Sequence, residues 1–295
     1  MAPFQKVGVL VRNASVDEAV LAFAAHMTQL GAEELICMHA VGEEDDAVHG
    51  SLDAKGLEDK VRAALASDVF QNTTCQILEG NHLQQVLRLA RDRDLDLAII
   101  GRKLPSSQAG LGSKIVRLVR KSPCSVLVVP ELCRPHFGRI LVAVDCSEHS
   151  KKAMTAAIAI AKASNEASPQ VLAVTVRHVP SRYDLAGVTF EESARAQRDY
   201  GRKDLDSFLS GLDAQGIPIE PLVLLSDAPA LAISHAAMAR KMDIVVAGSR
   251  GATAAAAALL GSTSEELLMT CAMPVLIVKQ KGETLRFLEA LFSTG

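Results

Sequence analysis

Tryptophan is absent from this 295-residue chain, tyrosine occurs twice, and aromatic residues make up only 3% of the sequence. Because hydrophobic residues still form 49% of the chain, aliphatic side chains must build the cores. No run of lysine and arginine and no basic patch interleaved with aromatics occurs, which argues against nucleic acid as a partner. No apolar stretch is long enough to span a membrane, and no signal-peptide pattern is present. We therefore expect neither a nucleic-acid partner nor a membrane.

Motifs for covalent catalysis and for metal binding are also missing. The six cysteines form no CxxC pair and no metal-ligand spacing with histidine, so we expect reduced thiols in a cytoplasmic protein. Gly-Lys-Ser/Thr does not occur, which excludes a Walker A phosphate loop. Neither a Ser-His-Asp set nor a general base placed for phosphoryl transfer can be identified. The sequence therefore predicts no catalytic residue and no metal ligand.

The two halves of the chain repeat one pattern of strands and helices. Continuous β-branched runs alternate with helical periods, which indicates parallel strands covered on both faces. Right-handed crossovers favour the strand order 3-2-1-4-5. We therefore predict an α/β fold of two tandem five-stranded parallel sheets. The paired strands are expected at 7–11 and 140–144, 34–40 and 170–176, 73–78 and 219–225, 96–101 and 243–248, and 125–129 and 275–278.

Domain boundaries follow from the interruption of this pattern. Residues 130–137 contain two prolines, so we place the linker there. The predicted domains are residues 1–133 and 138–281, followed by a tail at 282–295. Apolar residues of the tail recur at helical spacing, which favours a helix that covers its own domain, with a partner surface as the alternative. They are Leu285, Leu288, Leu291 and Phe292.

Glycines near the end of the chain form the most informative motif. Gly248 closes the predicted strand 243–248, and Gly251 and Gly261 follow at fixed spacing. Residues 262–266, Ser-Thr-Ser-Glu-Glu, then open a helix with N-cap and capping-box chemistry. Free backbone N–H groups and a helix dipole at the end of a strand form an environment that binds phosphate.

The predicted strand order places a second group beside these glycines. Ligands of open α/β sheets bind where the first and fourth strands lie side by side, at their carboxyl ends. In the second half those ends carry Asp145 and Gly248. A carboxylate there can accept from a ribose hydroxyl or an adenine amine, although Asp145 could simply form a loop. Alternatives also stay open nearby: Arg250 reaches phosphate or is solvated, and His149 contacts phosphate or is exposed.

These residues resemble the universal stress protein family in its tandem, two-domain form. The resemblance rests on the run 140–150, on Gly248-x2-Gly251-x9-Gly261-Ser262, and on Met273-Pro-Val-Leu-Ile-Val278. It implies a Rossmann-like fold of the adenine nucleotide alpha hydrolase type. It further implies that Asp145 faces the nucleoside, that Val179 offers backbone groups to adenine, and that the glycines hold ribose and phosphates. The residues predicted to bind the cofactor are Ala143, Val144, Asp145, Val179, Ala247, Gly248, Arg250, Gly251, Gly261, Ser262, Thr263 and Ser264.

Two features of the second half depart from the family pattern. Cys146 stands where the family often has glycine, and it would be strained if that position needs a positive φ. The run Ala254–Ala258 between the phosphate glycines offers no side-chain contact to phosphates and is predicted to form a short helical turn.

The first half departs much further and is interpreted as a degenerate copy. Arg12 stands where Asp145 stands, and Leu104-Pro105 replaces the glycine turn, which removes a backbone N–H. The interval to Gly112-Ser113 is also shorter by two residues than in the second half. We therefore expect one nucleotide for each chain, bound in the second half.

Three functions remain open from the sequence. The first is a cytoplasmic stress-response module that binds ATP, with or without Mg²⁺, and regulates an unknown protein partner. The second is a slow ATPase that uses the same site, and the third is an interaction protein without a nucleotide. The resemblance also implies that the last strands of the two halves pair within one chain as a pseudo-dimer, which leaves a homodimer possible.

Overall fold

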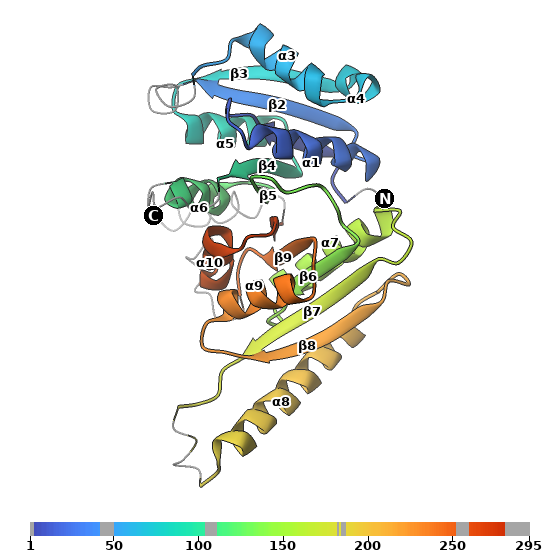
Figure 1. Ribbon diagram of the computed structural model, residues 1–295, viewed down its shortest axis with the longest axis vertical. Helices are drawn as coiled ribbons and strands as arrows, with labels where there is room; N and C mark the ends of the chain where they lie inside the picture. Colours follow the sequence, from blue (N-terminus) through green and yellow to red (C-terminus); the bar gives the residue numbers. More distant parts are fainter. Residues whose placement is uncertain are drawn as a thin grey trace, which may run out of the picture. The chain divides into compact units, whose positions relative to one another are not determined.

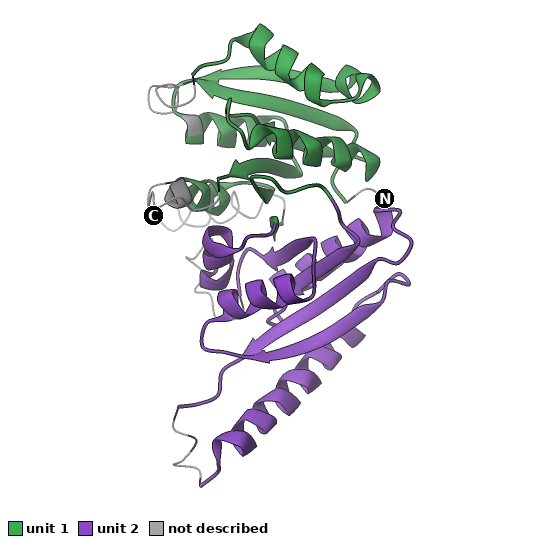
Figure 2. Cartoon of the chain, in the orientation of Figure 1, with its two compact units in different colours: residues 1–135, 274–295 green, residues 136–273 purple. Residues whose placement is uncertain are grey.

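The computed structural model describes residues 3–41, 50–103, 111–181, 183, 187–251 and 260–280. The chain forms two compact units, which Figure 2 shows in different colours. Unit 1 comprises residues 1–135 together with 274–295, and unit 2 comprises residues 136–273. The predicted tail, the turn at Ala254–Ala258 and the dipeptide Leu104-Pro105 lie outside the described residues.

The sheet of unit 1 follows the predicted order. Its strands are β1 (Lys6–Leu10), β2 (Glu34–Val41), β3 (Thr73–Glu79), β4 (Leu97–Arg102), β5 (Ser125–Pro130) and β10 (Val275–Val278). They lie in the order β3-β2-β1-β4-β5-β10. Strands β1 to β5 pair in parallel, which confirms the 3-2-1-4-5 order for this half. Every residue of β4 and β5 is buried, as expected for strands covered on both faces.

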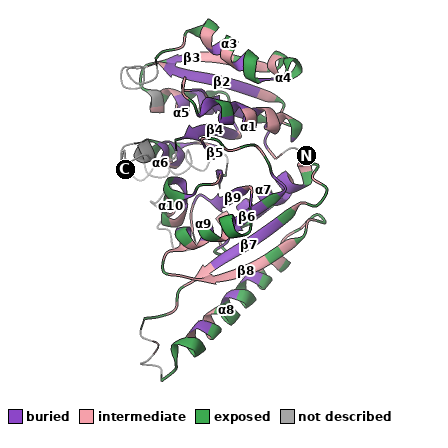
Figure 3. Cartoon of the chain, in the orientation of Figure 1, coloured by how far each residue is buried: buried purple, intermediate pink, exposed green. Residues whose placement is uncertain are grey.

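Helices cover the sheet of unit 1 (Figure 1). They are α1 (Asp17–Gln29), α3 (Ala54–Ala64), α4 (Ser67–Gln71), α5 (His82–Asp92) and α6 (Leu111–Lys121). Helix α1 contacts α3 and lies on β1 and β4, whereas α5 contacts α6 and lies on β2 and β3. Asn81 caps α5, since its side chain accepts from the Gln84 N–H at 3.1 Å. Figure 3 shows the buried strands between helices whose outer faces are exposed.

Strand β10 comes from the second repeat but completes the sheet of unit 1. It runs antiparallel to β5, with Val275 opposite Val128. Lys279 follows the strand, and its ammonium donates to the carbonyl oxygens of Arg120 at 3.0 Å and Ser122 at 2.9 Å. Carbonyls at the end of a helix lack intrahelical partners and carry partial negative charge, so a lysine there stabilises the end of α6. The predicted pairing of the two last strands is therefore confirmed.

The sheet of unit 2 repeats the arrangement around β6. Its strands, β6 (Arg139–Ala143), β7 (Gln170–Arg177), β8 (Ile219–Leu225) and β9 (Ile244–Gly248), are parallel and lie in the order β9-β6-β7-β8. Its helices are α7 (Glu148–Ala163), α8 (Phe190–Ser210), α9 (Pro229–Ala239) and α10 (Ser262–Thr270). The first and fourth strands of the repeat, β6 and β9, are neighbours, so the predicted switch point lies between their carboxyl ends.

Two helix ends in unit 2 differ from those that the sequence pattern indicates. The pattern offers Asp227 as a cap for a helix at 229–240, but the Asp227 carboxylate bonds Nδ1 of His178 and the N-cap position of α9 falls on Ala228. The pattern also extends a charged helix over 191–215, whereas α8 ends at Ser210 and Gly211 occupies its C-cap. No helix within the described residues is both long enough and apolar enough to cross a membrane.

Candidate functional site

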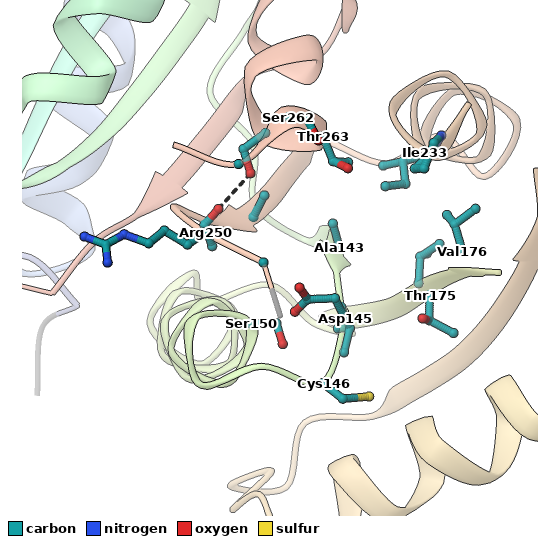
Figure 4. Close-up of a pocket in the computed structure, with 18 of the residues that line it drawn as sticks. Ala143, Asp145, Cys146, Ser150, Thr175, Val176, Ile233, Arg250, Ser262 and Thr263 are labelled. Carbon is teal, nitrogen blue, oxygen red and sulfur yellow. Dashed lines mark hydrogen bonds between the residues drawn. The ribbon is translucent and has the colours of Figure 1, made fainter. Parts of the chain in front are cut away.

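A cavity of about 560 Å³ opens at the carboxyl ends of β6, β7 and β9 (Figure 4). Its lining includes every predicted site residue except Val179: Ala143, Val144, Asp145, Ala247, Gly248, Arg250, Gly251, Gly261, Ser262, Thr263 and Ser264. Val179 lies two residues beyond the end of β7 and is not among the described residues that line the cavity. The glycine motif and Asp145 therefore meet in one cavity, as the strand order predicts.

Asp145 is held in place by the turn that leads into α7. Its Oδ1 accepts from the backbone N–H of Ser147 at 3.1 Å and from the Ser147 hydroxyl at 2.6 Å. The Ser147 hydroxyl in turn accepts from the Ser150 N–H at 3.2 Å and so caps α7. The carboxylate lies at the exposed end of β6, where a hydrogen-bond donor of a ligand can reach it (Figure 4).

Cys146 adopts the strained backbone conformation that the sequence raised as a possibility. Its φ is 62°, in the left-handed region that favours glycine. Its thiol donates weakly to the backbone oxygen of Asp204 at 3.8 Å. Burial raises the pKa of the Cys146 thiol, and the Asp204 and Asp145 carboxylates raise it further, whereas Arg177 acts in the opposite direction. Burial is therefore the main reason that this thiol is a weaker acid than an ordinary cysteine.

Close approaches of neighbouring atoms explain the glycines at 248 and 251. A Cβ atom on Gly251 would lie 2.7 Å from Oδ2 of Asp145, and one on Gly248 would lie 2.8 Å from the backbone carbon of His149. The Gly261 N–H donates to the Ser249 carbonyl at 2.8 Å, which brings the start of α10 beside Gly251. His149 is not among the described residues that line the cavity, so the prediction that it contacts phosphate gains no support.

The start of α10 differs from the predicted capping box. The N-cap position falls on Gly261, and no side chain caps the first turn among the described residues. The Ser264 hydroxyl instead donates to the Gly248 carbonyl at 2.8 Å and ties the helix to the end of β9. The first backbone N–H groups of the helix, at Ser262 and Thr263, therefore lie uncapped at the cavity, which is the arrangement that binds anions.

Charged side chains lie unevenly around the cavity. The guanidinium of Arg177, on β7, pairs with the carboxylate of Asp204, on α8. Figure 4 shows that the side chain of Arg250 points away from the cavity, although its residue lines the wall. Within the described residues, no group of three or more histidine, cysteine or acidic side chains could hold a metal ion.

Several lining residues were not predicted from the sequence. Val174, Thr175 and Val176 belong to the end of β7, and Pro229 and Ile233 to the start of α9. The strand order could have indicated these elements, because the carboxyl ends of neighbouring strands share one edge. No sequence signal places Asp204, which lies on a helix packed against β8 and β7.

The equivalent position in unit 1 is occupied by a different set of side chains. The strand registers place Arg12 where Asp145 lies. Lys6 pairs with Glu34 in unit 1, and Arg139 pairs with Gln170 at the same place in unit 2, so counting forward from Lys6 and Arg139 makes Arg12 equivalent to Asp145. The buried carboxylate of Asp17 accepts from the N–H of Arg12 at 2.9 Å, and the ammonium of Lys60 lies 2.8 Å away. A Cβ atom on Gly101 would lie 2.5 Å from Val16, so that side chain packs on the end of β4.

A buried histidine adds to this network in unit 1. Nδ1 of His39 lies 2.8 Å from the carbonyl of Val11, and Nε2 accepts from the Leu52 N–H at 3.2 Å. Both ring nitrogens are therefore used by the chain itself, with Nδ1 as the donor. Thr175, which lines the cavity of unit 2, holds the matching place on β7.

A comparison with protein families identifies the chain. The model of the universal stress protein family matches residues 3–130 and again residues 136–279. The chain belongs to this family. It carries two tandem copies of the universal stress protein domain, as the sequence predicts.

Individual relatives agree with this assignment. The chain is 34% identical over 143 residues to a protein of Thermus aquaticus named "Universal stress protein in QAH/OAS sulfhydrylase 3'region", covering 48% of this chain and 99% of that protein. It is 29% identical over 149 residues to the universal stress protein YxiE of Bacillus subtilis, covering 48% of this chain and 99% of YxiE.

Two solved structures match over nearly the whole chain. A universal stress protein from Archaeoglobus fulgidus gives a TM-score of 0.63 at 17% identity and covers 95% of this chain and 97% of its own. The protein PA1789 of Pseudomonas aeruginosa, whose title calls it functionally unknown, gives 0.62 at 16% identity and covers 99% and 98%. At these identities the match concerns the fold alone.

Proposed function

We propose that the second repeat binds ATP or a related adenine nucleotide in its cavity and acts as a regulatory module of the stress response. The observation that carries the proposal is the uncapped start of α10, which lies beside Gly251 and opposite the carboxylate of Asp145. Backbone N–H groups and a helix dipole suit a phosphate, and a carboxylate suits the hydroxyls of ribose or the amine of adenine.

The residues present fit an adenine nucleotide chemically. The absence of a Cβ at Gly251 lets the Asp145 carboxylate approach the phosphate loop, and the absence of a larger side chain at Gly261 keeps the space beside Gly251 open. Val176 and Ile233 offer an apolar surface for a base on the side of β7 and α9. If Mg²⁺ accompanies the nucleotide, phosphate oxygens must supply most of its ligands, and Asp145 is a carboxylate that lies beside Gly251 of the phosphate loop.

The partner and the domain boundaries belong to the same proposal. We place the degenerate domain at residues 1–133 and the nucleotide-binding domain at 138–281, within one intrachain pair that acts on a protein partner in the cytoplasm. Nucleotide binding would change the surface that this domain offers to that partner.

Mass spectrometry of a denatured extract of the full chain tests this proposal directly. Because the chain has no tryptophan and two tyrosines, a co-purified nucleotide would dominate its near-ultraviolet absorbance. Calorimetric titration with adenine nucleotides should then give one site for each chain. Absence of both co-purified nucleotide and measurable binding would contradict the proposal, and sustained phosphate release over many turnovers would favour the ATPase instead.

A further inference from the structure

Two cysteines of unit 1 lie in register on neighbouring strands. Cys37 on β2 is the partner of Cys75 on β3 in the parallel ladder. Residues in register point to the same face of a sheet, and neighbouring strands lie about 4.8 Å apart. This separation falls within the Cα–Cα range of disulfides, about 4.4–6.8 Å. Both side chains are free thiols in the structure, so the ladder holds two thiols at a spacing that a disulfide bond can bridge.

The two thiols differ in their access to solvent. Cys37 is buried, whereas Cys75 is half-exposed on β3, which lies at the end of the sheet order. Helix α3 packs on this strand (Figure 1), and the charges of its Glu58 and Arg62 act on the Cys75 thiol. These two side chains pair with each other at 2.7 Å and remain largely exposed themselves. A small solute therefore reaches Cys75 first, with Cys37 directly beside it.

The surroundings keep both thiols protonated at neutral pH. Burial raises the pKa of Cys37, and the neighbouring Cys75 raises it further. Burial also raises the pKa of Cys75, Glu58 adds to this shift, and Arg62 opposes it. Because the thiolate is the reactive form, oxidation of this pair is slow at neutral pH and accelerates as the pH rises. Sustained exposure to an oxidant is therefore needed to convert the pair.

Unit 2 carries other residues at the equivalent place. With the first residues of β2 and β7 aligned, Ala173 takes the position of Cys37. The ladder partner of Ala173 is Pro221, on β8. Neither side chain can be oxidised to a disulfide. The pair of thiols therefore belongs to the first repeat and is not required by the scaffold that the two repeats share.

We propose that Cys37 and Cys75 form a reversible disulfide when the protein meets hydrogen peroxide, which gives unit 1 an oxidant-sensitive site that does not depend on nucleotide binding. The Cys75 thiolate attacks a peroxide oxygen, an S–O bond forms, the O–O bond breaks, and the departing hydroxide is protonated to water. The Cys37 sulfur then attacks the sulfur of the sulfenic acid, the S–S bond forms, and the S–O bond breaks. The second hydroxide leaves with the Cys37 proton. Two thiols thus lose two electrons and two protons, and one peroxide becomes two waters.

The position of the pair also fits a bond that can be reduced again. A relaxed disulfide needs Cβ atoms about 3.8 Å apart, so the two strands must draw together locally. A strand at the edge of a sheet can make this adjustment, and the residual strain makes the bond easier to reduce. The bond closes the chain around α3 and α4, which restricts the unfolded state. We therefore expect the oxidised protein to melt at a higher temperature than the reduced protein.

The test is peptide mapping of the folded full chain after treatment with hydrogen peroxide. Remaining thiols are alkylated, and the chain is digested without reductant for mass spectrometry. We expect a peptide pair joined through Cys37 and Cys75, about tenfold more abundant than any other cysteine pair, which disappears after dithiothreitol. The same treatment in urea should remove this preference, because the register is lost. An equal preference in urea would overturn the role of the ladder.

Two matched variants test the assignment. Cys75→Ser should abolish the joined peptide and the rise in melting temperature. Cys133→Ser removes another half-exposed thiol of unit 1, outside β2 and β3, and should leave both unchanged. Oxidation of Cys75 to sulfinic or sulfonic acid while Cys37 stays a thiol would overturn the proposal. So would a pair that stays fully reduced at peroxide doses that oxidise the exposed Cys146. Neither result bears on the nucleotide site of unit 2.

Discussion

Units 1 and 2 share one backbone turn but place side chains of opposite charge beside it. After the first strand of each repeat, one residue adopts a left-handed conformation: Asn13 with φ 55° and Cys146 with φ 62°. The residue before it is Arg12 in unit 1 and Asp145 in unit 2. The turn is therefore kept while the charge beside it is reversed.

The helix next to this turn also carries side chains of opposite charge in the two units. In unit 1 the Lys60 ammonium bonds the Asn13 side chain at 3.3 Å and pairs with the buried Asp17. In unit 2 the backbone of Asp204 accepts from Cys146, and Asp204 pairs with Arg177 at the cavity. Backbone pairing between the strands forms the same scaffold in both units. At the strand ends, a few side chains bind one another in unit 1 and line a cavity in unit 2.

Among the tests of this difference, we expect the largest effect from Gly261→Val in the full chain. The added side chain would fill the space beside Gly251, so we expect nucleotide affinity to fall about 100-fold or more, which is at least about 2.7 kcal/mol. Because unit 1 has Arg12 in place of the carboxylate, no second site should replace the lost one. Calorimetry gives the affinity, and Gly211→Ala, at a helix end outside the cavity, is the matched control. If Gly261→Val bound adenine nucleotide with wild-type affinity, the proposed difference between the two units would be wrong.

The reversed charge itself is tested by Asp145→Asn. The amide oxygen can still accept from Ser147, but the charged acceptor for the nucleoside is lost. We expect the binding of adenine nucleotide to weaken by about 1.5–3 kcal/mol, the range for hydrogen bonds to charged groups. Asp213→Asn is the control, since Asp213 accepts from the N–H two residues later, as Asp145 does, but does not line the cavity. Equal affinities of both variants would remove Asp145 from the site.

The third prediction concerns the free energy of unfolding, which we expect to depend more on the charged network of unit 1 than on that of unit 2. Lys60→Met leaves the buried carboxylate of Asp17 without its ammonium partner, so we expect the free energy of unfolding to fall by about 1–3 kcal/mol. Asp204→Asn, at the comparable place in unit 2, affects an exposed pair and should cost about 0–1 kcal/mol. Urea unfolding followed by circular dichroism compares them. If Asp204→Asn lowered the free energy of unfolding more than Lys60→Met does, our interpretation of the two networks would be wrong.

The smallest expected effect concerns the reactivity of Cys146. Because its pKa is raised, its thiolate fraction at pH 8 is below that of an ordinary cysteine, and alkylation should accelerate as pH rises toward that pKa. Asp204→Asn removes one cause of the shift, so we expect roughly two- to fivefold faster alkylation at pH 8. Site-resolved mass spectrometry measures the rate, with the half-exposed Cys75 of unit 1 as internal control. Slower alkylation of Cys146 in this variant would contradict the assigned cause.

Much of the fold and most of the lining of the candidate site could be predicted, because both follow from local sequence. The β-branched strand runs and the glycine spacing place Gly248, Gly251 and Gly261 without any knowledge of distant contacts. The cap of α10 could not be predicted, because the Ser264 hydroxyl bonds the end of a strand rather than its own helix. The direction of Arg250 likewise depends on tertiary packing that no spacing encodes.

Two further features lay beyond the sequence for the same physical reason. The rotation of α8 decides that Asp204 lines the cavity, and a long amphipathic pattern fixes that rotation only loosely. Val179 was assigned from the resemblance alone, and the end of β7 instead brings Val176 to the cavity. The role of Val179 toward adenine stays a prediction.

The position of β10 has a consequence for how the protein is made. A ribosome releases β5 early, with an apolar edge whose partner is encoded almost a whole repeat later. At the usual elongation rates that wait lasts on the order of ten seconds. During synthesis the first unit therefore carries an open strand edge of the kind that invites aggregation, until β10 and Lys279 arrive to close it. The repeat that is translated first is the one that is completed last.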